Sequence, residues 1–142
     1  MNCQNSDSLS LCVLNVCGLK RRLNYPEFLD FLHKYDIMCV TETKTDDSDD
    51  VNIEGYAFLS KHRSQAYKRK SGGIGVYVRN EISQYINVVH GESEYIMWLT
   101  IDKKLTNYTE NAILGVTYLP PESSRFLNED DFRTFEIEIS NI

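Results

Sequence analysis

The hydrophobic positions of this chain alternate between strand-like runs and a helical period. The apolar run over residues 9–16 predicts a buried strand. Asn24 and Pro26 predict a helix start, because apolar side chains then recur at helical spacing over residues 28–35. A second short apolar run, residues 37–41, predicts another strand. The order strand, helix, strand is typical of a βαβ unit with two parallel strands.

The remainder of the chain is dominated by strand-like runs separated by turn residues. These runs cover residues 56–59, 73–79, 82–89, 95–101 and 112–118. The last two are expected to pair as a hairpin with a long loop. From residue 128, apolar spacing fits either a helix with an acidic first turn or an alternating strand, and we favour the helix.

Composition indicates one globular domain over residues 9–142 after a flexible polar lead, residues 1–8. The chain has 142 residues, 42% hydrophobic and 25% charged, which suits a single core. Its four cysteines contain no CxxC pair, so reduced, buried thiols are expected rather than a zinc site. Neither a signal peptide nor a membrane span is recognisable. We therefore expect an intracellular protein of the nucleus or cytoplasm.

The charge pattern leaves two interpretations open. A net charge of −6 argues against unspecific attraction to phosphate backbones. The basic residues nevertheless gather in two segments, residues 20–22 and 61–70. Each segment is either a solvated loop or a loop that faces phosphate.

Two polar residues stand at the ends of the predicted parallel strands. Asn15 interrupts the first apolar run near its end, and Glu42 directly follows the second. Because the carboxyl ends of parallel strands share one edge of a sheet, these side chains are expected to be neighbours. A carboxylate beside a carboxamide suits a hard cation such as Mg²⁺, held weakly by one Glu. Alternatively, Asn15 bonds to backbone in a turn and Glu42 is a solvated acid.

Tyr118 ends the last predicted strand, two positions before Pro120. Its hydroxyl either meets the same sheet edge or serves packing, and the residues alone do not choose between these roles.

Four motifs in order resemble the endonuclease/exonuclease/phosphatase superfamily: LNVCGL (residues 14–19), VTETK (40–44), SGGIGVYV (71–78) and GVTYLPP (115–121). They look most like the endonuclease domains of non-LTR retrotransposons, related by fold to apurinic/apyrimidinic endonucleases. The resemblance implies an α/β fold, the amino-terminal portion of a two-sheet sandwich of the deoxyribonuclease I type. It also implies that Asn15 orients the metal and phosphate, Glu42 is the principal ligand of Mg²⁺ or Mn²⁺, and Tyr118 contacts the scissile phosphate.

The implied substrate is the phosphodiester backbone of DNA, or of RNA. The candidate substrate-binding residues are the cations of the two basic segments: Lys20, Arg21, Arg22, Lys68, Arg69 and Lys70.

Two later motifs of the superfamily are absent here. These are GDxN, which supplies transition-state residues, and an SDH-like motif, which supplies the general base. We therefore expect an incomplete, inactive domain whose partner is the missing carboxy-terminal half. One sheet with an uncovered inner face is the expected result. The alternatives are a non-catalytic module that binds nucleic acid or protein, and part of a small-phosphate or phosphoinositide hydrolase.

Overall fold

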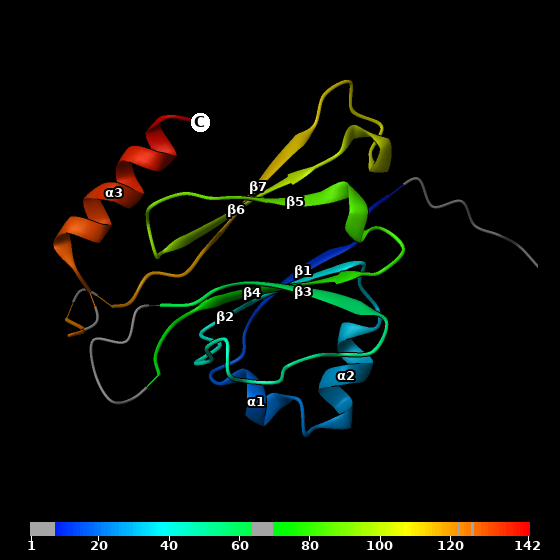
Figure 1. Cartoon of the computed structure of the whole chain (residues 1–142), viewed down its shortest axis with the longest axis horizontal. Coiled ribbons are helices and arrows are strands. Elements are labelled where there is room, and N and C mark those ends of the chain that lie inside the picture. The colour runs from blue at the N-terminus through cyan, green and yellow to red at the C-terminus, as the bar shows by residue number, and fades with distance from the viewer. Residues whose placement is uncertain (1–7, 64–69, 122, 126) are drawn as a thin grey trace, which may run out of the picture.

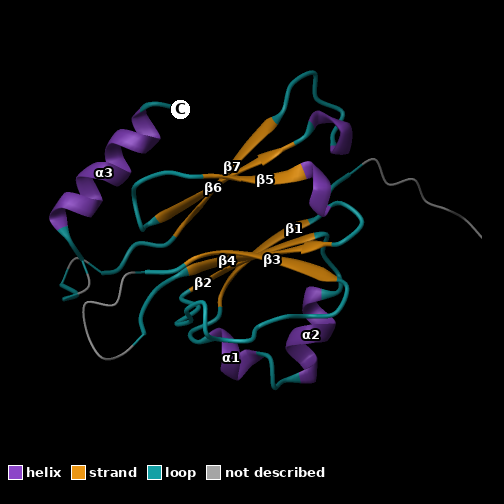
Figure 2. Ribbon diagram, viewed as in Figure 1, coloured by secondary structure: helices purple, strands orange, loops and turns teal. Residues whose placement is uncertain are grey.

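Two β-sheets lie face to face in the computed structural model, which describes residues 8–63, 70–121, 123–125 and 127–142 (Figure 1). Two short helices cover the outer face of one sheet, and a longer helix lies beside the other (Figure 2). This arrangement confirms the prediction of an α/β fold of the two-sheet sandwich type.

The first sheet contains the predicted βαβ unit. Its strand order is β1-β2-β4-β3, and β1 runs parallel to β2, as expected. A short helix that the sequence did not predict, α1, follows β1, and α2 ends at Leu32, earlier than its apolar spacing indicated. The elements are β1 (Leu11–Asn15), α1 (Leu19–Arg22), α2 (Pro26–Leu32), β2 (Ile37–Thr41), β3 (Tyr56–Lys61) and β4 (Ile74–Arg79).

The second sheet is an antiparallel meander of order β5-β6-β7, which confirms the predicted hairpin. The run predicted as one strand over residues 82–89 is divided, because a 3₁₀ turn precedes β5. The tail is a helix, in which Asn128 Oδ1 accepts a hydrogen bond from Asp130 N at 2.9 Å. The elements are η1 (Ser83–Tyr85), β5 (Ile86–Val89), β6 (Ile96–Ile101), η2 (Lys103–Leu105), β7 (Ala112–Thr117) and α3 (Glu129–Ser140).

The expectation of one sheet with an uncovered inner face is wrong. Cys39 and Val76 of the first sheet pack with Met97, Leu99 and Val116 of the second in one buried cluster. The chain supplies both layers because the strands after β4 fold back over the first sheet. Exposed apolar surface on the first sheet is confined to its β1 edge, where Leu11 and Val13 are 38% and 57% exposed.

The cysteines only partly match the expectation of buried thiols. Cys39 is buried, and burial raises the pKa of its thiol to about 12, so it stays protonated at neutral pH. Cys17, in contrast, is exposed because it lies in the turn after β1. No helix in the described ranges is long and apolar enough to cross a bilayer.

Candidate functional site

The carboxyl ends of β1 and β2 meet at one edge of the first sheet. Asn15 is the register partner of Thr41, so Glu42 begins the loop beside the end of β1. Pairing continues past the strands, because Gly18 N donates to Glu42 O at 2.9 Å and Leu19 N to Thr43 O at 2.8 Å. These bonds hold the two loops together at the edge where sequence reasoning placed the candidate site.

Left-handed backbone is concentrated at this edge. Cys17, Glu42 and Lys44 have φ values of 47°, 56° and 54°, a conformation that residues other than glycine rarely adopt. The loop is held there by tertiary hydrogen bonds, including Lys44 N to Gly72 O at 2.8 Å. Strain of this kind typically gathers at functional sites, so the edge is a candidate site on backbone grounds as well.

Glu42 and Tyr118 line one cleft of about 400 Å³ between the ends of β2 and β7. Burial and the neighbouring Glu42 carboxylate raise the pKa of the Tyr118 phenol, which therefore stays protonated at neutral pH. A neutral phenol beside a carboxylate can donate a hydrogen bond, either to Glu42 or to a bound oxygen ligand. The structure thus brings two of the three predicted site residues together.

Asn15 lies at the same strand end, but its side chain faces a different cavity. Its Oδ1 accepts a hydrogen bond from Cys17 N at 3.0 Å, and the residue lines a hollow with Tyr25 and Phe28 rather than the Glu42 cleft. This hydrogen bond from the backbone to the Asn15 side chain is the turn that the alternative interpretation of Asn15 predicted. A role for Asn15 in orienting metal or phosphate therefore stays a prediction.

The donor set fits a weakly held, hydrated hard cation. Across the described ranges, three or more His, Cys, Asp or Glu side chains do not gather at any point that could hold a metal ion. Among the described residues that line the cleft, Glu42 is the single acidic one, and Lys44 Nζ lies 3.8 Å from its Oε1. Mg²⁺ keeps several waters and binds through one or two carboxylates together with substrate phosphate, which suits such a site.

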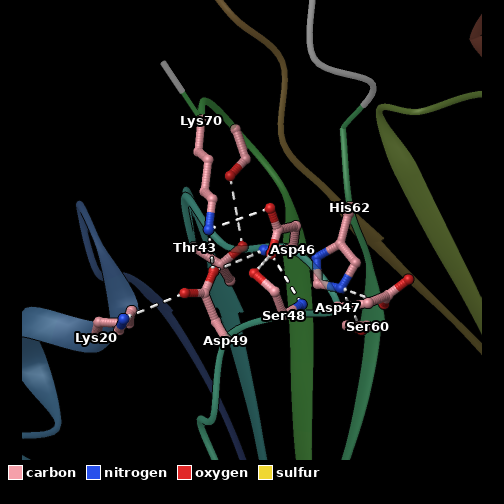
Figure 3. A network of polar contacts seen from close by, with 10 residues as sticks. Lys20, Thr43, Asp46, Asp47, Ser48, Asp49, Ser60, His62 and Lys70 are labelled. Atoms are coloured by element: carbon pink, nitrogen blue, oxygen red, sulfur yellow. Dashed lines mark hydrogen bonds and ion pairs between the residues drawn. The ribbon is translucent and has the colours of Figure 1, made fainter. Parts of the chain in front are cut away.

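Two of the predicted substrate-binding cations are paired with carboxylates of the loop after Glu42 (Figure 3). Lys70 Nζ lies 2.7 Å from Asp49 Oδ2 and 3.1 Å from Asp46 Oδ2, and Lys20 Nζ lies 3.2 Å from Asp49 Oδ1. We call these four residues the acidic clasp. The clasp ties α1 and the start of β4 to the loop that carries Glu42, so these lysines have a structural role in the described state.

The structure says less about the other predicted substrate-binding cations. Arg22 Nε donates to Val16 O at 2.9 Å, and a hydrogen bond that Arg21 donates to the Tyr25 side chain raises the pKa of Arg21 on the exposed side of α1. Lys68 and Arg69 lie outside the described residues. Substrate binding by all six cations stays a prediction.

Acid is expected to weaken the clasp. Hydrogen bonds from Lys70 and from Asp46 N hold the pKa of Asp49 well below its usual value of 3.8. Because the folded pKa is depressed, the ionised carboxylate stabilises the fold above pH 4 or so and loses this effect as pH falls further. Urea unfolding should therefore show Asp49→Asn to be less stable than the original chain at pH 7, with the gap narrowing below pH 4.

Asp47→Asn is the matched control for that experiment. The Asp47 side chain is fully exposed, at 100%, although its Oδ1 lies 3.0 Å from His62 Nε2. Exposed pairs contribute little, so this variant should unfold like the original chain. A stability gap for Asp49→Asn that is constant from neutral to acidic pH would contradict a role for its charge.

Sequence reasoning did not single out Arg63 as a site residue, yet it lines the Glu42 cleft. Its Cζ lies 5.7 Å from the ring centroid of Tyr118 and 5.8 Å from that of Tyr95. A Cβ at Gly72 would lie 2.3 Å from the same Cζ, so a larger residue there would displace the guanidinium, and the φ of 59° at this position also favours glycine. The available signal was the doubled glycine that follows the basic segment.

Gly73 is required for a similar reason, because a Cβ there would lie 2.4 Å from Thr43 Oγ1.

Comparisons with known proteins identify the family and the fold of the chain. The model of the endonuclease/exonuclease/phosphatase family matches residues 12–136. Over 77 residues the chain is 29% identical to a probable RNA-directed DNA polymerase from transposon BS of Drosophila melanogaster, covering 54% of this chain and 8% of that protein. It is also similar to an AP endonuclease structure from Archaeoglobus fulgidus, with a TM-score of 0.56 and 17% identity over 91% of this chain.

The chain spans about half of that AP endonuclease, 49% of its length, and shares its two-sheet fold. The family match includes Asn15, Glu42 and Tyr118 and extends into α3. The protein therefore belongs to the endonuclease/exonuclease/phosphatase family.

Proposed function

We propose that this chain carries the metal-binding part of a phosphodiesterase site that acts on nucleic acid and nicks DNA in its complete form. The observation that supports this most is the meeting of Glu42 and Tyr118 in one cleft lined also by Lys44, Arg63 and Arg125. A carboxylate among several cations offers both a metal ligand and donors for a phosphate. The transposon polymerase similarity favours a polynucleotide over a small phosphate or phosphoinositide.

Each residue of the cleft would have a distinct role. Glu42 would hold Mg²⁺ or Mn²⁺, and the bound ion would stabilise negative charge on the phosphate oxygens. Tyr118, protonated at neutral pH, would donate a hydrogen bond to the phosphate. Asn15, at the adjoining strand end, would orient that phosphate once its side chain turned from Cys17.

The chain by itself is proposed to be inactive, with the remainder of the domain as its partner and an intracellular location. No histidine lines the Glu42 cleft among the described residues. His62 pairs with Asp47, and His33 Nδ1 lies 2.6 Å from Leu29 O at the end of α2. We infer that neither histidine serves as the general base, and loss of one member of a catalytic unit costs several orders of magnitude in rate.

Glu42→Gln is expected to weaken Mn²⁺ binding by roughly tenfold or more, because the substitution removes the single acidic side chain among the described residues of the cleft. Binding is measured by Mn²⁺ electron paramagnetic resonance, which detects the free ion and needs no catalysis. Glu110→Gln, an exposed acid of the β6–β7 loop, removes the same charge elsewhere and should leave the affinity unchanged.

Equal Mn²⁺ affinity for both variants would overturn the proposed metal site. A plasmid-nicking assay with and without Mg²⁺ tests the proposed inactivity on the same preparations. Nicking that Glu42→Ala abolishes would refute inactivity while supporting the site. Salt-dependent DNA binding without any Mn²⁺ site would instead favour the non-catalytic binding module.

A further inference from the structure

The Arg63 guanidinium occupies the wall of the Glu42 cleft, where three separate segments hold it. Tyr118 comes from the end of β7, Tyr95 from the start of β6, and Gly72 from the loop before β4. The side chain is partly buried, so its position is set by these contacts rather than by solvent. Arg63 therefore connects the two sheets at the rim of the candidate site.

Packing of this kind is well suited to binding an anion. Aromatic rings and a glycine contact a guanidinium through its faces, while its N–H groups point outward in its own plane. Those N–H groups match the oxygen spacing of a phosphate and can donate two parallel hydrogen bonds. A guanidinium oriented in advance loses less entropy on binding than a flexible lysine does.

Two other cations of the cleft lie beside carboxylates. Lys70 pairs with Asp46 and Asp49 in the acidic clasp, and Lys44 Nζ lies 3.8 Å from Glu42 Oε1. Arg63 contacts the ring of Tyr118, the residue proposed to meet the phosphate. Because Arg63, Tyr118 and Glu42 line the same cleft, a phosphate bound there would lie near the guanidinium.

We propose that Arg63 binds a non-bridging oxygen of the substrate phosphodiester, with Tyr95, Tyr118 and Gly72 holding its guanidinium in place. The inference rests on the proposed function, because it assumes that the phosphate lies against Glu42 and its metal ion. It adds a substrate-binding residue that lies in none of the four family-like motifs and assigns a purpose to the close approach at Gly72.

The effect of Arg63 on metal and on phosphate should differ. Removing a cation from the cleft favours, or leaves unchanged, the binding of a divalent cation at Glu42. The same removal disfavours a phosphate, which loses a charge-assisted hydrogen bond. A residue with a purely structural role would instead weaken both when replaced.

The test compares Arg63→Met with the original chain in two titrations. One uses Mn²⁺ alone, followed by electron paramagnetic resonance. The other uses the dinucleotide thymidylyl-thymidine, which holds one phosphodiester, at saturating Mg²⁺ and is followed by ¹⁵N–¹H NMR. Arg63→Met should raise the dissociation constant of the dinucleotide roughly tenfold and leave Mn²⁺ affinity equal or higher. Arg63→Lys should recover part of the dinucleotide affinity.

Arg79→Met is the matched control. Arg79 Cζ lies 5.5 Å from the ring centroid of Tyr56, so this variant removes an equivalent cation–π contact at the opposite ends of β3 and β4. Its dinucleotide affinity should match that of the original chain. Circular dichroism and thermal unfolding of all variants establish that each one folds.

The outcomes separate this inference from the proposed function. Unchanged dinucleotide binding in Arg63→Met, with Mn²⁺ binding still dependent on Glu42, overturns the Arg63 assignment alone. Loss of both ligands in a folded Arg63→Met variant also overturns it, because that result indicates a structural role. An original chain without Mn²⁺ binding at Glu42 overturns the proposed function and the inference together.

Discussion

Leu99→Ala is expected to lower the free energy of unfolding by about 2–5 kcal/mol, the usual cost of truncating a buried leucine. Leu99 of β6 is fully buried, at 0% exposure, in the cluster between the two sheets. Truncation removes apolar contacts with the first sheet and leaves a cavity that a rigid sandwich closes only in part. Urea denaturation followed by far-ultraviolet circular dichroism measures the change.

Ile113→Ala is the matched control for Leu99. Ile113 of the neighbouring strand β7 is 61% exposed and lies on the opposite face of the second sheet. Its truncation should cost well under about 1 kcal/mol, as exposed substitutions usually do. Equal losses for the two variants would contradict the packing of one sheet on the other.

Glu138→Ala is expected to release α3 from the second sheet. Glu138 Oε1 accepts from Ser93 N at 2.8 Å and from Glu92 N at 2.5 Å, and its Oε2 accepts from Trp98 Nε1 at 3.0 Å. The substitution leaves these donors without their acceptor, at a cost of about 2–3 kcal/mol. Because Trp98 is the single tryptophan of the chain, its fluorescence reports the change directly.

A red shift of Trp98 emission together with easier cleavage of α3 by protease is the expected result. Glu136→Ala serves as the control, because Glu136 is exposed on the same helix and its substitution keeps the Glu138 contacts. Identical emission spectra for Glu138→Ala and the original chain would show that Glu138 does not anchor the helix.

Local pattern was sufficient for the elements that depend on a single segment. The apolar run of β2 was predicted with its observed bounds, Ile37–Thr41, and the Asn128 start of α3 followed from its acidic first turn. The parallel pairing of β1 and β2 also followed, since a strand, helix and strand in that order favour one arrangement. The predicted neighbourhood of Asn15 and Glu42 in the backbone is a direct consequence of that pairing.

Local pattern was insufficient where distant segments compete for the same partner. The basic residues Lys20 and Lys70 were candidates for phosphate, yet both pair with Asp49, at distances in sequence that no local spacing reveals. The second sheet was expected to be missing, although each of its strands lies within a run that was predicted as a strand. Counting strands does not tell which face each one covers.

The sequence by itself determined the order of the strands, the helices α2 and α3, and the position of Glu42 at a strand end, because hydrophobic period and turn residues act over a few neighbouring positions. Only the tertiary structure decided that β5, β6 and β7 cover the first sheet, that Arg63 lies against Tyr118, and that Asn15 faces away from their cleft. These outcomes depend on which distant surfaces bury the most apolar area together, a choice made by the whole chain.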